Sequence, residues 1–222
     1  MKIKKYSAII LAGIMALSLT ACDNSGSSSG SSDSSETNSS VSNTSSDASS
    51  SDVNSSNTES TPAQSLDPVA VLKTAWDAHK DEQKFPAMGG DTDEKNMRDG
   101  EPGVYGVADA SLLDTTFGFP AAMADKIDSA GSLMHMMNAN TFTAGAFHVK
   151  DAKDIQGIAD AIKKNISERQ WMCGFPEKLV IVSTGDVIVS MFGYGEAIDT
   201  FKTCLTASYA DASVLCDMPI EV

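Results

Sequence analysis

Basic and aromatic residues are scarce in this sequence, and no apolar segment is long enough to cross a bilayer. Only 16 of the 222 residues are Lys or Arg, against 30 Asp or Glu, and aromatic residues make up 6%. The net charge of −14 predicts an acidic surface that repels nucleic acid, so we exclude nucleic acids as partners. The main apolar run, Ser7–Leu19, has 13 residues, whereas a membrane-spanning helix needs about 20.

Catalytic motifs are also missing from the sequence. It contains no serine-triad signature, no phosphate-binding loop, no paired-carboxylate signature and no zinc-ligand spacing. Gly193-Tyr194-Gly195 lacks the third glycine of a dinucleotide-binding loop and is better explained as a strand-to-helix turn. The sequence therefore predicts no catalytic residue.

The N-terminus has the features of a lipoprotein signal. A basic segment, residues 1–5, precedes the short apolar core, as in secretory signal peptides. Residues 19–22 (LTAC) resemble the lipobox at which bacterial lipoproteins are acylated and cleaved. We therefore predict a signal peptide over residues 1–21 and a diacylglycerol group on Cys22, with no other cofactor. Two or three acyl chains give stable anchoring, since each buried CH₂ contributes about 0.8 kcal/mol.

Residues 22–65 are predicted to be the lipidated cysteine and a disordered linker. Of residues 23–65, 20 are Ser and none is Lys or Arg. Such a segment cannot bury enough apolar surface to offset the entropy lost on ordering. We expect a coil with an end-to-end distance of roughly 35 Å that spaces the domain from the membrane. Residues 66–222 remain for a single folded domain.

The spacing of apolar residues predicts helices and strands within residues 66–222. Asp67-Pro68 favours a helix start, because Asp caps the first turn and Pro fits it. Gly185-Asp186 lies between two β-branched runs, which predicts a tight hairpin. Helices are expected over residues 68–80, 109–117, 154–168 and 196–209, and strands over 132–137, 141–150, 178–184, 187–192 and 213–218. Residues 81–107 are expected to form a long polar loop.

The order of these elements predicts the fold. From residue 141 onward the order is strand, helix, strand, strand, helix, strand, which is the ferredoxin-like split βαβ pattern. We therefore predict an α+β fold, with an antiparallel sheet that carries two helices on one face. The strand at 132–137 extends this sheet, and N-terminal helices precede it.

Four features occur together within residues 112–209: the sequence SLM at 132–134, the helix at 154–168, the segment WMCGFPE at 171–177 and the hairpin at 185–186. In this combination the chain resembles a family of Firmicutes lipoproteins that carry a domain of unknown function, number 4358. The resemblance implies a lipobox, a low-complexity spacer and one α+β domain. It also favours a host with a single membrane, but it implies no catalytic residue because the family has no assigned reaction.

Three cysteines remain when Cys22 is set aside: Cys173, Cys204 and Cys216. Cys204 and Cys216 could form a disulfide, although two buried thiols are favoured. Cys173 would act as a nucleophile only beside a base that converts it to thiolate.

Two segments offer metal binding as an alternative function. The sequence MHMM at 134–137 combines thioethers with an imidazole, ligands that suit Cu(I), although Met in a strand also fills cores. The acidic segment 91–101 could attract Ca²⁺, but Lys95 occupies a ligand position of the EF-hand pattern and the required Gly is missing. Structural roles are favoured for both segments, so the sequence predicts no metal ligands.

Phe85, Trp171 and Phe175 lie in glycine-containing connectors and form the candidate binding surface. Aromatic residues on loops are typical of recognition surfaces, although a Trp that follows an amphipathic helix often closes a core. The sequence thus predicts a protein anchored by lipid to the extracytoplasmic face of the cell membrane. Its domain is expected to bind an envelope or extracellular partner without catalysis; the alternatives are a metal-handling lipoprotein or an enzyme of unknown type.

Overall fold

The structure is a computed structural model that describes residues 65–172 and 174–221. The predicted signal peptide, Cys22 and all of the predicted linker except Ser65 lie outside the described residues. None of the helices in the described part of the chain combines the length and the apolar character needed to cross a bilayer.

The predicted helices and strands are present in the structure. The helices are α1 (Pro68–Asp77), α2 (Ala110–Phe117), α3 (Ile155–Ser167) and α4 (Gly195–Ser208), with short 3-10 turns at η1 (Asp81–Gln83), η2 (Ala121–Lys126), η3 (Ala139–Thr141) and η4 (Ala152–Asp154). The main strands are β4 (Ile127–His135), β5 (Phe142–Val149), β6 (Lys178–Thr184), β7 (Val187–Gly193) and β8 (Ser213–Pro219). The side chain of Asp67 accepts a hydrogen bond from the backbone of α1, as predicted for a helix cap.

Three short strands occupy the segment that was expected to be a loop. They are β1 (Ala87–Gly89), β2 (Arg98–Asp99) and β3 (Gly103–Tyr105). β1 and β3 both pair with β4, and β2 pairs with β1. Strands of two or three residues are too short to show the alternation of apolar and polar side chains on which sequence prediction depends.

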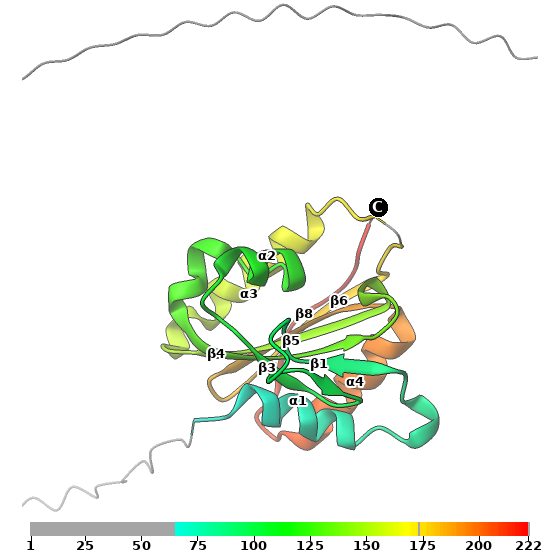
Figure 1. Ribbon diagram of the computed structural model, residues 1–222. Coiled ribbons are helices and arrows are strands. Elements are labelled where there is room, and N and C mark those ends of the chain that lie inside the picture. The colour runs from blue at the N-terminus through cyan, green and yellow to red at the C-terminus, as the bar shows by residue number, and fades with distance from the viewer. Residues whose placement is uncertain (1–64, 173, 222) are drawn as a thin grey trace, which may run out of the picture. The chain divides into compact units, whose positions relative to one another are not determined.

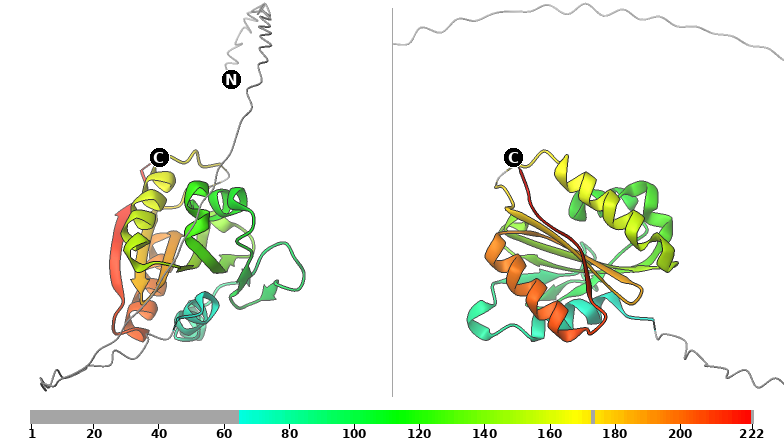
Figure 2. Two further views of the ribbon diagram at one scale, coloured as in Figure 1. Left: turned by 90° about the vertical axis from the view of Figure 1, so that its left-hand side faces the viewer. Right: turned by 180° about the vertical axis from the view of Figure 1, so that it is seen from behind.

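All eight described strands form one antiparallel sheet, which confirms the predicted α+β class. The strand order is β2-β1-β4-β5-β7-β6-β8, and β3 also pairs with β4. Figure 2 shows β8, drawn in red, at one edge of the sheet and the green β1–β2 segment at the other.

The prediction that both long helices lie on one face of the sheet is wrong. Figure 1 shows the sheet between α2 and α3 on one side and α1 and α4 on the other. α3 buries Ile158, Ile162 and Ile166 in one apolar cluster, together with Ile181 and Ile188 of the sheet. α4 buries Ile198, Phe201 and Leu205 in a second cluster, together with Val180 and Val189. Because neighbouring residues of a strand point to opposite faces, these two clusters lie on opposite sides of the sheet.

The strand order explains this difference from the ferredoxin-like arrangement. α3 leads from β5 across β7 to β6, and α4 leads from β7 across β6 to β8, in the same direction along the sheet. β5 and β7 run in opposite directions. Since such crossovers are almost always right-handed, the two helices must lie on opposite faces. In the ferredoxin-like order the last strand would lie beside β5, a position that β4 occupies here.

Candidate functional site

Phe85, the first residue of the predicted binding surface, is half-buried at the margin of the core on the α1–α4 face. Its ring lies 5.0 Å from that of Trp76 and 4.9 Å from that of Phe142, measured between centroids. It also stacks on His135 at 5.3 Å. Most of this side chain therefore serves to pack the loop before β1 onto the sheet.

Trp171 lies on the other face of the sheet. Its ring is 5.2 Å from that of Phe192, and the guanidinium of Arg169 lies 5.2 Å above it. Trp171 packs against the α2–α3 cluster, as expected of a Trp that closes a core after an amphipathic helix. The structure therefore does not bring Phe85 and Trp171 together in one concave site.

Phe175 is the exposed member of the predicted surface, with 55% of its area accessible. Three further apolar side chains are exposed near it: Met137 (81%), Met172 (78%) and Tyr194 (47%). They come from the β4–β5, α3–β6 and β7–α4 connections, which meet at one end of the sheet. We call Met137, Met172, Phe175 and Tyr194 the sheet-end surface. Of these four residues, the sequence analysis predicted only Phe175. Met137, Met172 and Tyr194 could have been found in the same way, because each is an apolar residue in a connection.

Hydrogen bonds hold these connections to one another. The side-chain amide of Asn140 donates to the carbonyl oxygens of Met172 (2.9 Å) and Gly174 (3.0 Å). The backbone N–H of Tyr194 donates to the carbonyl oxygen of Thr141 at 2.9 Å. The exposed side chains are thus carried on loops fixed by mutual contacts, which lowers the entropy cost of binding.

Two hollows flank the sheet-end surface. The first has a volume of about 580 Å³ and is lined by Asp114, Thr115, Asn140, Arg169, Gln170, Trp171 and Met172. The second has a volume of about 260 Å³ and is lined by His79, Glu82, Gln83, Phe85, Tyr194, Glu196, Ala197 and Thr200. Each hollow contains one of the predicted aromatic residues, so Phe85 and Trp171 adjoin the sheet-end surface from opposite faces of the sheet.

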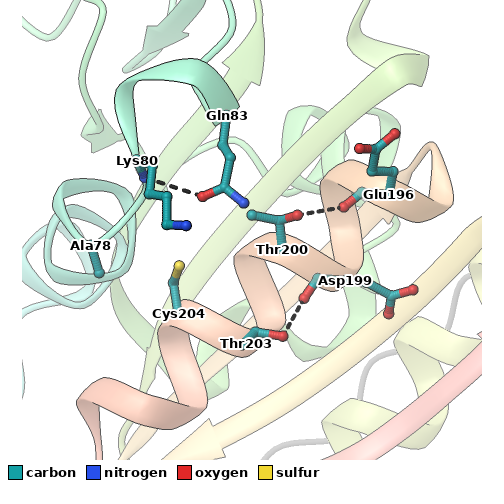
Figure 3. A pocket seen from close by; sticks show the side chains of 8 residues that line it. All are labelled: Ala78, Lys80, Gln83, Glu196, Asp199, Thr200, Thr203 and Cys204. Carbon is teal, nitrogen blue, oxygen red and sulfur yellow. Dashed lines mark hydrogen bonds between the residues drawn. The ribbon is translucent and has the colours of Figure 1, made fainter.

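A third hollow, of about 570 Å³, lies between the end of α1 with η1 and α4 (Figure 3). Its residues are Ala78, Lys80, Gln83, Glu196, Asp199, Thr200, Thr203 and Cys204. The hydroxyls of Thr200 and Thr203 donate to backbone carbonyls of their own helix, at 2.8 and 2.7 Å. Burial raises the pKa of the Cys204 thiol, which keeps it protonated and a poor nucleophile. This hollow therefore offers hydrogen-bonding groups but no activated thiolate.

The proposed disulfide alternative for Cys204 and Cys216 is wrong. Both cysteines are free and half-buried. Cys204 lies on α4, whereas Cys216 in β8 packs against the cluster on the α2–α3 face. The sheet separates the two sulfur atoms, and neither is fully buried as the favoured alternative expected. Cys173 lies outside the described residues.

Neither of the two segments named for the metal-binding alternative forms a set of metal ligands. In the acidic segment, the Asp91 carboxylate accepts hydrogen bonds from Asn96 and Gly106, and Asp93 pairs with Lys95 at 2.6 Å. His135 points to the α1–α4 face, away from Met134 and Met136, because neighbours in a strand alternate. Among the described residues no three His, Cys, Asp or Glu side chains lie together in a group that could hold a metal ion.

A cluster of polar side chains surrounds His148, at the end of the sheet opposite to the sheet-end surface. Its Nδ1 lies 2.5 Å from Asp128, and its Nε2 lies 2.9 Å from Asp186 and 2.8 Å from the Ser65 hydroxyl. The set resembles a Ser-His-Asp triad, but a triad needs an Nε2 that can accept the serine proton. Burial opposes the charged form of His148, yet its hydrogen bonds to the two carboxylates outweigh burial and raise the pKa. The carboxylates therefore favour the charged form of the ring, which joins two strand ends to Ser65.

The ion pairs of His148 should make stability depend on pH. Because the folded-state pKa is raised, the stabilisation is complete below the ordinary value of about 6.5 and is lost as pH rises through the folded value. We expect His148→Gln to destabilise the full chain in detergent by about 1.5 kcal/mol at about pH 5.5, and by less at about pH 9. Urea unfolding of both proteins at the two pH values measures this, and a cost that grows towards high pH would contradict it.

Comparisons with known proteins found no matching protein family, no similar curated protein and no similar solved structure.

Proposed function

We propose that this chain is a lipid-anchored protein of the extracytoplasmic membrane face, and that its domain binds an envelope or extracellular protein without catalysing a reaction. The observation that carries the proposal is the sheet-end surface. It contributes four of the nine exposed large apolar side chains in the described part of the chain. Single apolar side chains are normal on protein surfaces, whereas several at one place mark interaction sites.

The positions of Ser65 and Leu66 support this function. The backbone N–H of Leu66 donates to Asp186 at the tip of the β6–β7 hairpin, and Ser65 contacts His148 near the end of β5. The sheet-end surface lies at the other end of these strands. A tether that starts at Cys22 would enter the domain away from the surface, which would leave the surface open to a partner.

The charges around the surface indicate the chemistry of the partner. Glu82 and Glu196 line the hollow beside Tyr194, and the carboxylate of Glu177 accepts the N–H of Gly195 at 2.8 Å. An apolar centre with an acidic rim is complementary to an apolar patch surrounded by Lys and Arg. The expected partner is therefore a protein with a basic, partly apolar surface.

Site-specific photo-crosslinking in cells of the host tests the proposed surface. A photoreactive amino acid replaces Phe175 in the full chain, and the matched control carries it at Val214, which is similarly exposed at 46% on the edge strand β8. We expect a discrete crosslinked protein from position 175 and none from position 214. Adding Met137→Ser and Met172→Ser should lower the crosslink yield by about tenfold, because truncated contact residues weaken binding by 1–2 kcal/mol or more.

Two results would contradict the proposal. Identical crosslinks from positions 175 and 214 would show that contact is nonspecific, and an undiminished yield in the double serine variant would remove the sheet-end surface from the interface.

The anchor is tested separately with Cys22→Ser. We expect the wild-type chain to partition into the detergent phase with an acylated N-terminus by mass, and the variant to remain in the aqueous phase.

A further inference from the structure

A cavity of about 360 Å³ at the β1–β2 edge of the sheet is lined largely by methionine. Its residues are Met88, Met97, Arg98, Asp99 and Met136. Met88 belongs to β1, Met97 immediately precedes β2 and Met136 immediately follows β4. Methionines from three separate segments of the chain therefore line one cavity.

The register of the strands places these side chains on one face. Met88 lies opposite Asp99 on β2 and opposite Met134 on β4. Paired residues of an antiparallel ladder share a face, and so do residues two apart along a strand. Met97, two residues before Asp99, and Met136, two residues after Met134, therefore point to the same side as Met88. The N–H of Met136 bonds to the carbonyl oxygen of Pro86 at 2.9 Å, which continues the ladder to this point.

The lining of the cavity carries one negative and one positive side chain, those of Asp99 and Arg98. Asp99 lies opposite Met88, so its carboxylate is on the same face as the methionines. The neighbouring Arg98 alternates to the other face of the strand, and its Nη1 atom donates to the backbone carbonyl oxygens of Lys95 (2.8 Å) and Met97 (2.7 Å). Met97 and Met136 are 43% and 45% exposed, so an ion could reach the sulfurs from solvent.

We infer that Met88, Met97 and Met136 bind one Cu(I) ion, with the Asp99 carboxylate balancing its charge. Thioethers are soft ligands that favour Cu(I) over Zn²⁺, Ca²⁺ or Mg²⁺. The site differs from the MHMM set of the sequence, since His135 faces the other side of the sheet and two of the three ligands lie in the segment that looked like a loop. The inference is independent of the sheet-end surface, and it involves binding without any change in the oxidation state of the metal.

Anaerobic Cu(I) titration of the full chain in detergent, against a chromogenic Cu(I) chelator, tests the site. We expect the triple variant Met88→Leu, Met97→Leu, Met136→Leu to take one Cu(I) fewer from the chelator than the wild-type chain, because the free thiols of Cys204 and Cys216 can bind Cu(I) in both proteins. Each single variant should weaken binding by about tenfold or more. Leu keeps the volume and apolar character of Met, so folding should be retained, and circular dichroism with a thermal melt checks this.

Two methionines outside the cavity provide the matched control. Met123→Leu and Met218→Leu change side chains that do not line the cavity and that pack beside the α2–α3 cluster, and the double variant should bind Cu(I) like the wild type. X-ray absorption of the Cu(I)-loaded chain should show sulfur neighbours. Failure of the wild-type chain to take Cu(I) from the chelator would overturn the inference, as would unchanged binding in a folded triple variant.

Discussion

Gly193→Ala is expected to destabilise the domain by about 3 kcal/mol or more, enough to remove much of the stability of an ordinary domain. Gly193 ends β7 with a φ of 156°, a conformation that L side chains rarely adopt. A Cβ atom would collide with the carbonyl oxygen of Thr141 and lie 2.7 Å from its carbonyl carbon. Both are backbone atoms of the connection that carries the sheet-end surface, so neither can move without breaking strand pairing. Urea unfolding of the full chain in detergent measures the change.

Gly157→Ala is the matched control, because it makes the same chemical change in open space. Apart from the adjacent residues and the backbone of α3 itself, no atom lies within 4 Å of a Cβ added at Gly157. Ala has the higher helix propensity and reduces the entropy of the unfolded chain, so this variant should gain about 0.5–1 kcal/mol. Equal stabilities for the two alanine variants would mean that the close approach at Gly193 does not exist.

Phe147→Ala should destabilise the domain by about 3–5 kcal/mol, as is usual when a buried aromatic side chain leaves a cavity. Phe147 is fully buried in β5, and its ring contacts Phe117 and Phe119 at centroid separations of 5.5 and 4.7 Å. The substitution would remove one of the main contacts between the sheet and the segment that contains α2.

Phe175→Ala makes the same change in the sheet-end surface and should alter stability by no more than about 0.5 kcal/mol. The reason is that Phe175 is more than half exposed. Thermal melts and urea titrations of the two variants give the comparison directly. A large cost at Phe175 would place its ring in the core and remove it from the candidate surface.

The sequence was sufficient to predict elements with strong local signals. α3 shows apolar residues at helical spacing, and the β6–β7 hairpin has two β-branched runs around Gly185-Asp186. The face on which a helix packs has no such local signal. α3 and α4 each bury one apolar side, and only the position of β8 beside β6 determines that these sides point towards each other across the sheet.

The candidate sites were predictable only in part, for the same reason. Phe175 could be identified because it is an aromatic residue in a connector. The methionine cavity could not, because Met88 and Met97 are nine residues apart in a segment without periodicity, and pairing of β1 with β2 and β4 brings them together. Long-range strand pairing of this kind has no signature in a single sequence.

The contact of Leu66 with the hairpin tip also determines how the domain would bear mechanical load. If the chain is held at Cys22 and a partner binds the sheet-end surface, tension reaches the β6–β7 hairpin through the hydrogen bonds of Ser65 and Leu66. While these bonds hold, the tension acts between the two ends of β6 and β7, parallel to the strands. Hydrogen bonds of an antiparallel ladder run across the strands, so such tension loads them in shear and all together. A domain loaded in this direction should resist unfolding under force better than one in which the force separates two strands by breaking one hydrogen bond after another.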